Sequence, residues 1–200
     1  KINLYIIIIG LVVNDIKQTI NSINTILKEK KLKIIVVAPK IIKNRIQNEF
    51  SYKSIYFVCD KKEGIYQAMN KGLSSSKSHN SFIWFLNSGD LAESKKIKNL
   101  LDFKNKNDSL SKDIIFFINT RKTSFVSILY KFMSIIGIED IKIIKIFMLI
   151  LVFPTSHQNI IIKNKIHKKF DLNYKYSSDF KQIITNISKD HTEYLGNKIS

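Results

Sequence analysis

Cysteine, arginine, proline and glycine are all scarce in this chain of 200 residues, which has 1 Cys, 2 Arg, 2 Pro and 6 Gly. A single cysteine excludes a disulfide framework and a cysteine-based zinc site, and it fits a reducing compartment. The low content of Pro and Gly excludes a linker or a collagen-like chain, and 44% hydrophobic residues exclude a disordered tail. The length fits one domain with a sizeable core.

The formal net charge of +17 comes from 31 lysines, and its distribution decides what it means. Successive blocks of fifty residues carry +6, +4, +3 and +4, so the chain has no basic block or arginine-rich stripe of the kind that binds nucleic acid. We interpret the lysines as a solvated surface, which also favours contact with an anionic membrane face.

Long hydrophobic runs are few and short. Residues 2–13 are too few to span a bilayer and lack a signal-peptide cleavage site, so we expect a buried strand there. Charged residues interrupt the apolar stretches 124–138 and 143–153, which we interpret as two core or interfacial helices.

Strand and helix patterns alternate from residue 2 to residue 119, which predicts an α/β fold with a mostly parallel sheet. Asn14 and Asp15 are the expected caps of the first helix. A short strand at 159–163 and a helix from about Asp179 follow, within one domain over residues 1–200. The other expected strands are 33–38, 54–59, 81–86 and 113–119, and the other expected helices are 41–50, 64–75 and 93–104.

Ligands of such sheets bind beyond the carboxyl ends of the strands. In this sequence the segments at those ends are Asn14-Asp15, 60–64 and 87–90. The segment FLNSGD, residues 85–90, places Asp90 after a buried strand. Its carboxylate suits Mg²⁺ or Mn²⁺ holding a diphosphate, since such an ion needs only one or two protein carboxylates. The alternative is that Asp90 caps a helix starting near Leu91.

Two further segments are candidates for chemistry. EGIYQAMNKG, residues 63–72, either presents Lys71 and backbone N–H groups to an anion or is an ordinary amphipathic helix. His157 in PTSHQ and Asp179 in SSDF are either structural residues or, facing the Asp90 cleft, a phosphate or metal contact and a general base. His79, His167 and His191 have polar, Lys-rich neighbours, and we expect them to be exposed.

Taken in order, four segments resemble the family 2 glycosyltransferases of bacterial polysaccharide synthesis. They are VVNDIKQTINSI (12–23), EGIYQAMNKG with FLNSGD at this spacing, PTSHQNIII (154–162) and FDLNYKYSSDF (170–180). The resemblance implies a GT-A fold, a Rossmann-like three-layer sandwich with a helical acceptor-side C-terminal part. It implies a nucleotide-sugar-binding half over about 1–90 and an acceptor-binding half over about 91–200.

The resemblance also implies a metal-dependent hexosyltransferase that moves a sugar from a nucleotide diphosphate sugar to an acceptor hydroxyl with inversion. Asp90, and His157 with it, would bind Mg²⁺ or Mn²⁺, and Asp179 would be the catalytic base. The acceptor would be lipid-linked or a polysaccharide, and the enzyme cytoplasmic or peripheral at the inner face of the plasma membrane. The donor-binding residues implied are Val13, Asn14, Asp60, Glu63, Asn70, Lys71, Asn87 and Ser88.

The chain departs from the family pattern at three positions. Ala38 stands where members carry an acidic residue after the second strand, and Lys62 and Gln67 replace two aspartates around Gly-Ile-Tyr. These changes motivate an alternative, a non-catalytic nucleotide-sugar-binding module of the same fold.

Overall fold

The computed structural model describes residues 3–29, 31–50, 52–76, 80–106, 114–116, 160–179, 181–182 and 192–194. Strands and helices alternate along the N-terminal half, as the sequence predicts. The elements are β1 (Leu4–Ile9), α1 (Val13–Ser22), the 3-10 turn η1 (Asn24–Ile26), β2 (Leu32–Pro39), α2 (Lys40–Glu49), β3 (Ile55–Asp60), α3 (Ile65–Ser75), β4 (Phe82–Asn87), α4 (Ser94–Lys106), β5 (Ile114–Phe116), β6 (Ile160–Lys163), the 3-10 turn η4 (Asn164–Ile166) and β7 (Thr192–Tyr194).

The strands form one sheet in the order β3-β2-β1-β4-β6-β5-β7. β1 pairs in parallel with β2 and β4, and β2 pairs in parallel with β3. β6 runs antiparallel to both β4 and β5, while β5 and β7 are parallel. The predicted mostly parallel sheet is therefore confirmed, and the four parallel strands end at one shared edge.

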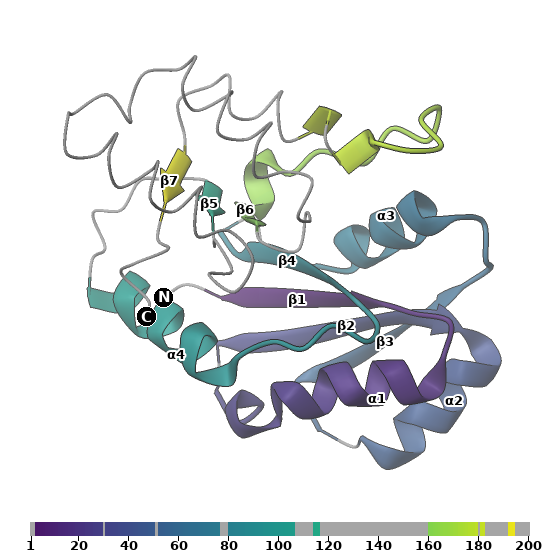
Figure 1. The fold of residues 1–200 in the computed structure, drawn as a ribbon, viewed down its shortest axis with the longest axis horizontal. Helices are drawn as coiled ribbons and strands as arrows, with labels where there is room; N and C mark the ends of the chain where they lie inside the picture. The colour runs from purple at the N-terminus through teal and green to yellow at the C-terminus, as the bar shows by residue number, and fades with distance from the viewer. Residues whose placement is uncertain are drawn as a thin grey trace, which may run out of the picture.

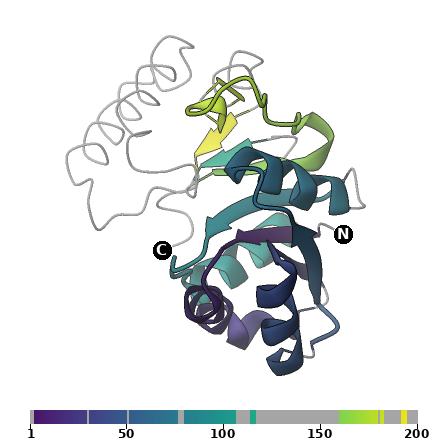
Figure 2. The same ribbon diagram turned by 90° about the vertical axis from the view of Figure 1, so that its right-hand side faces the viewer.

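Helices cover both faces of the sheet, which makes three layers (Figures 1 and 2). In Figure 1, α1, α2 and α4 lie below the sheet and α3 lies above it. Successive side chains of a strand point to opposite faces, so Ile6 and Ile8 join the core on the α1 side and Tyr5 and Ile7 join the core under α3. β1 is thus buried on both faces, which explains its apolar run without alternation.

The start of α1 differs from the prediction. The residue before the helix is Val12, with no side-chain cap, so Asn14 and Asp15 lie inside the first turn and are not caps. The helix begins early because the chain turns within three residues of β1. Asp15 still places a negative charge near the helix N-terminus, where the helix dipole favours it.

Helical backbone at residues 178, 179, 181 and 182 agrees with a helix near Asp179. The expected helices 124–138 and 143–153, with His157, His79 and His191, lie outside the described residues. Among the helices that the structure describes, none is both long enough and apolar enough to cross a membrane.

Candidate active site

Polar residues gather where the parallel strands end. β3 ends at Asp60, which pairs in register with Pro39 at the end of β2. β4 ends at Asn87, which pairs with Ile9 at the end of β1. The predicted segments at 60–64 and 87–90 therefore lie at the same edge of the sheet, about three strand spacings, roughly 14 Å, apart.

The turn after β4 is fixed by backbone hydrogen bonds. The Ser88 N–H donates to the Ile9 carbonyl at 2.9 Å, and the Gly89 N–H donates to the Thr19 hydroxyl at 2.9 Å. Gly89 has φ of +95°, a conformation that favours glycine. Since Thr19 is fully buried in α1, the turn is tied to the buried face of that helix.

Asp90 closes this turn on itself. Its Oδ2 atom accepts the Asn87 N–H at 2.9 Å, and its own N–H donates to the Asn87 carbonyl at 3.2 Å. α4 begins only at Ser94, so the alternative in which Asp90 caps a helix near Leu91 is wrong. The carboxylate is instead held beside Asn87 at the carboxyl edge.

Gly10, for which the sequence alone indicates no role, makes this arrangement possible. A Cβ atom added there would lie 2.5 Å from the Ser88 Cβ atom and 2.6 Å from the Ile16 Cγ1 atom. Both distances are shorter than real Cβ contacts, so only glycine lets the β1–α1 loop approach the turn this closely.

Asp60, Glu63 and Lys71, three of the predicted donor-binding residues, form one ion-pair cluster. The Lys71 Nζ atom lies 3.2 Å from Asp60 Oδ1 and 3.2 Å from Glu63 Oε2. Asp60 is 7% exposed, and its Oδ2 atom accepts the Lys62 N–H at 3.0 Å. Desolvation lowers the pKa of Lys71, but the hydrogen bonds and charges of Glu63 and Asp60 outweigh it and raise that pKa.

α3 also contacts the segment that carries Asp179. The Tyr66 hydroxyl donates to Asp179 Oδ1 at 2.9 Å and accepts the Ser178 N–H at 3.2 Å. Burial, followed by the hydrogen bond and charge of Asp179, raises the pKa of Tyr66. The phenol therefore keeps its proton at neutral pH and remains the donor in this pair.

Asn70 lies one helical turn after Tyr66 and is buried. Its Nδ2 atom donates to the Phe170 carbonyl at 2.9 Å, and its Oδ1 atom accepts the Phe170 N–H at 2.7 Å. The structure thus gives Asn70 a link between α3 and the chain after β6, while its predicted contact with a donor remains a prediction.

His167 is buried, so the expectation that it is exposed is wrong. Its ring lies 5.4 Å from the Phe85 ring and 5.5 Å from the Phe170 ring, centroid to centroid. Burial lowers the pKa of His167 to about 4, so the imidazole is neutral at neutral pH. Counting lysines near it in sequence could not reveal this, because the aromatic partner Phe85 comes from β4.

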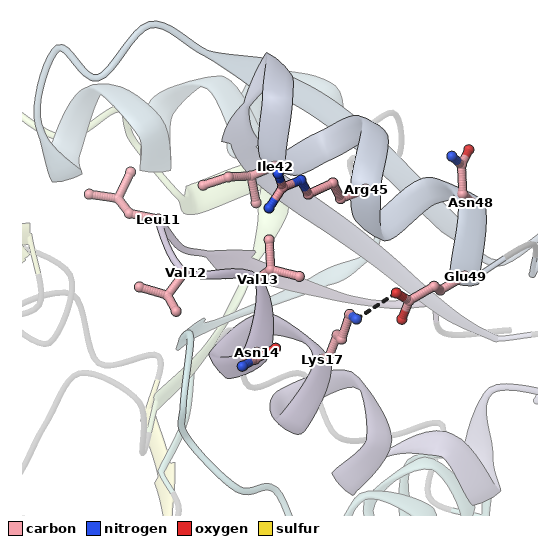
Figure 3. Close-up of a pocket in the computed structure, with 9 residues that line it drawn as sticks. All are labelled: Leu11, Val12, Val13, Asn14, Lys17, Ile42, Arg45, Asn48 and Glu49. Atoms are coloured by element: carbon pink, nitrogen blue, oxygen red, sulfur yellow. Dashed lines mark hydrogen bonds and ion pairs between the residues drawn. The ribbon is translucent and has the colours of Figure 1, made fainter.

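A groove of about 740 Å³ opens between α1 and α2 (Figure 3). An ion pair between Lys17 of α1 and Glu49 of α2 joins the two helices that line the groove, and Val13 and Asn14 lie on its α1 side. The groove is lined by Leu11, Val12, Val13, Asn14, Lys17, Ile42, Arg45, Asn48 and Glu49. It includes two predicted donor-binding residues but neither Asp90 nor Asp179.

The donor atoms of the Asn87–Asp90 turn fit a hard divalent cation, since they are carboxylate, hydroxyl and amide oxygens. No group of three or more His, Cys, Asp or Glu side chains able to enclose a metal occurs within the described residues. A metal ion at this turn would therefore need oxygen atoms of a bound phosphate compound as well as the Asp90 carboxylate. Mg²⁺ is commonly bound in this way, by one or two carboxylates and the phosphates of a substrate.

No protein-family model matches the chain, and no curated protein matches it. Solved structures do. TarS 1–349 from S. aureus matches with a TM-score of 0.61 at 12% identity, over 98% of this chain and 58% of that one. Glucosyl-3-phosphoglycerate synthase from Mycobacterium tuberculosis, in complex with Mn²⁺, UDP and glucosyl-3-phosphoglycerate, matches with a TM-score of 0.59 at 13% identity, over 96% and 68%.

The chain has the GT-A fold. This confirms the fold class implied by the four sequence segments. The chain spans 58% of TarS 1–349 and 35% of a longer TarS structure. The identity to these proteins is only 12–14%, so the similarity establishes the fold of this chain and no more.

Proposed function

We propose that this chain is a glycosyltransferase that moves a sugar from a nucleotide diphosphate sugar to an acceptor hydroxyl. The observation that carries the proposal is that Tyr66, in the motif at the start of α3, hydrogen-bonds Asp179, the predicted base. Two of the segments that resemble family 2 are thereby in contact, although they are 113 residues apart. The GT-A fold and the Asn87–Asp90 turn at its carboxyl edge support the same function.

In this proposal the Asp179 carboxylate is the general base. It takes the proton of the acceptor hydroxyl while that oxygen bonds to the anomeric carbon, and the nucleoside diphosphate leaves from the opposite side. Attack opposite the leaving group inverts the anomeric configuration.

The turn at Asp90, with His157, is the proposed site for Mg²⁺ or Mn²⁺. Such an ion, when bound, would neutralise charge on the leaving diphosphate. The synthase from M. tuberculosis was crystallised with Mn²⁺ and UDP, which supports testing Mn²⁺ first.

The donor is proposed to contact the carboxyl edge. Its nucleoside would lie near Val13 and Asn14 in the groove of Figure 3. TarS was crystallised with UDP and the synthase with UDP-glucose, so uridine nucleotides are the first donors to test. The remaining donor contacts we propose are Asp60, Glu63, Asn70, Lys71, Asn87 and Ser88.

We further propose membership of family 2, with a lipid-linked or polysaccharide acceptor and a cytoplasmic or peripheral membrane location. Four ordered sequence segments support the family, and the net charge of +17 favours an anionic membrane surface.

A second candidate is a nucleotide-sugar-binding module without catalysis. Ala38 at the end of β2 favours it, since no carboxylate stands there, and the neighbouring Asp60 is paired with Lys71. Both candidates would bind a nucleotide sugar, so only a measurement of sugar transfer distinguishes the non-catalytic module from the enzyme.

The experiment is a thermal-shift screen of nucleotide sugars, starting with UDP-glucose, with and without Mn²⁺. A ligand at 100 times its Kd stabilises the folded state by about 2.7 kcal/mol, which is readily measured. Each donor that binds is then tested for sugar transfer or slow hydrolysis. Binding with turnover supports the enzyme, binding without turnover supports the module, and no binding contradicts both.

A further inference from the structure

Tyr66 and Asn70 lie on one face of α3, four positions apart. Both reach the same distant segment. Tyr66 contacts the Asp179 carboxylate and the Ser178 backbone, and Asn70 holds both polar groups of Phe170. We call these two residues the α3 clamp.

The clamp is anchored by buried packing. Phe170 is 5% exposed, stacks on the Tyr66 ring at 5.6 Å and meets the Phe85 ring edge-on at 5.4 Å. α3 packs closely on the sheet, because a Cβ at Gly72 would lie only 2.5 Å from the Ile7 Cγ2 atom. The clamp therefore fixes where residues 170–179 lie relative to the central strands.

The residues between the two contact points have exposed side chains. Leu172, Tyr174 and Tyr176 are 56%, 45% and 73% exposed, so they add little buried packing. The segment is thus fixed at Phe170 and again at residues 178–179, with an exposed loop between. At the second point the Tyr66 hydroxyl bonds both Ser178 and Asp179. Just beyond it, Lys181 pairs with Asp171 and the Gln182 amide donates to the Lys168 carbonyl.

We propose that Tyr66 is a positioning residue for the catalytic base and that Asn70 anchors the segment carrying it. The inference rests on the proposed function, in which Asp179 is that base. Tyr66 donates to one carboxylate oxygen and accepts the neighbouring backbone N–H, so it orients the side chain and its backbone together. Tyr66 acts through Asp179 and not on the sugar.

The test is Tyr66→Phe, which removes the hydroxyl and keeps the ring that stacks on Phe170. Tyr56→Phe is the matched control, because Tyr56 is 46% exposed on β3 and its ring lies under the Lys33 ammonium. Amide hydrogen exchange over residues 170–182 and steady-state kinetics with the donor found above are measured on both.

We expect Tyr66→Phe to speed exchange at residues 178–179 and to lower kcat about tenfold to a hundredfold, the effect of one charge-assisted hydrogen bond. The KM and Kd for the donor stay unchanged. Tyr56→Phe changes neither exchange nor kcat. A purely structural role would instead lower melting temperature and donor affinity together with kcat.

Unchanged exchange in Tyr66→Phe overturns the clamp, and faster exchange with wild-type kcat overturns the positioning role. If the wild-type protein binds donors but transfers no sugar, the proposed function and the positioning role of Tyr66 in catalysis are both contradicted. The hydrogen-exchange data still decide in that case whether the α3 clamp exists. Asn70→Ala, measured in the same way, is expected to speed exchange at Phe170 as well.

Discussion

The hydroxyl of Tyr66 donates a hydrogen bond of 2.9 Å to the Oδ1 atom of Asp179, across 113 positions of the sequence. It joins the helix that follows β3 to the chain that follows β6. Because α3 packs on the central strands, this bond gives a late part of the chain a defined place relative to the sheet.

Asp90→Ala is expected to abolish the Mn²⁺-dependent part of donor binding. Substitution removes the only carboxylate of the Asn87–Asp90 turn, and hard divalent cations need oxygen ligands. The measurement is the thermal shift with UDP-glucose, with and without Mn²⁺. Asp102→Ala, an exposed acid on α4, is the matched control and should keep the full shift. Equal shifts in both variants would show that Asp90 holds no metal.

Gly10→Ala should destabilise the fold by about 1–3 kcal/mol, the usual cost of adding a methyl group to a packed site. The new Cβ would meet Ser88 at 2.5 Å and force the turn after β4 to shift. Denaturant unfolding measures the loss. Leu11→Ala, at the neighbouring position that is 59% exposed, should have little effect. A Gly10→Ala variant as stable as wild type would mean that the loop and the turn are not in close contact.

His167 predicts a pH dependence of stability. Its pKa is about 4 in the folded protein against 6.5 ordinarily, so the unfolded chain binds more protons between these values. The contribution of His167 to the free energy of unfolding is therefore fully present above pH 6.5. As the pH drops from 6.5 toward 4, the free energy of unfolding falls by up to about 1.4 kcal/mol per pH unit.

Urea unfolding at pH 7, 6 and 5 measures this slope. His167→Phe keeps an aromatic ring between Phe85 and Phe170 and removes the titrating group. Its stability should therefore depend less on pH than that of the wild type. Identical slopes in the two proteins would assign the acid sensitivity to other groups.

Ser178, which is buried, and Ser22, which is half-buried, should respond differently to removal of the hydroxyl. The Ser178 hydroxyl is buried, and the part of the chain that the structure describes offers it no hydrogen-bond partner. Ser178→Ala should therefore leave stability unchanged or raise it by about 1 kcal/mol. The Ser22 hydroxyl donates to the Thr19 carbonyl at 2.7 Å and accepts the Ala92 N–H at 3.1 Å. Ser22→Ala should cost about 1–2 kcal/mol, and thermal unfolding of the two variants tests the contrast.

Local patterns predicted the strands and helices of the first hundred residues well, because strands buried on both faces and amphipathic helices leave direct traces in the sequence. The start of α1 was predicted wrongly. Asn14 and Asp15 resemble caps, but the close contact of Gly10 with Ser88 decides where the chain turns. Such a contact between two loops has no local signal.

The candidate site was predictable at the level of segments more than of side chains. The motifs named Asp90, Asn87 and Asp179 as candidates, and their roles stay predictions; the structure adds that Asp90 bonds Asn87 and that Tyr66 bonds Asp179. The burial of His167 could not be predicted, since its environment is made by aromatic rings from β4 and from after β6. Pairings of this kind depend on tertiary packing and not on composition.

The central claim is that Asp179 takes the proton of the acceptor, and a comparison of Asp179→Asn with wild type tests it most directly. The substitution keeps the size of the side chain and its ability to accept from Tyr66, but it removes the base. We predict an unchanged donor Kd with a kcat lowered about a hundredfold to ten-thousandfold, the usual contribution of a general base. A kcat equal to that of the wild type would contradict the account.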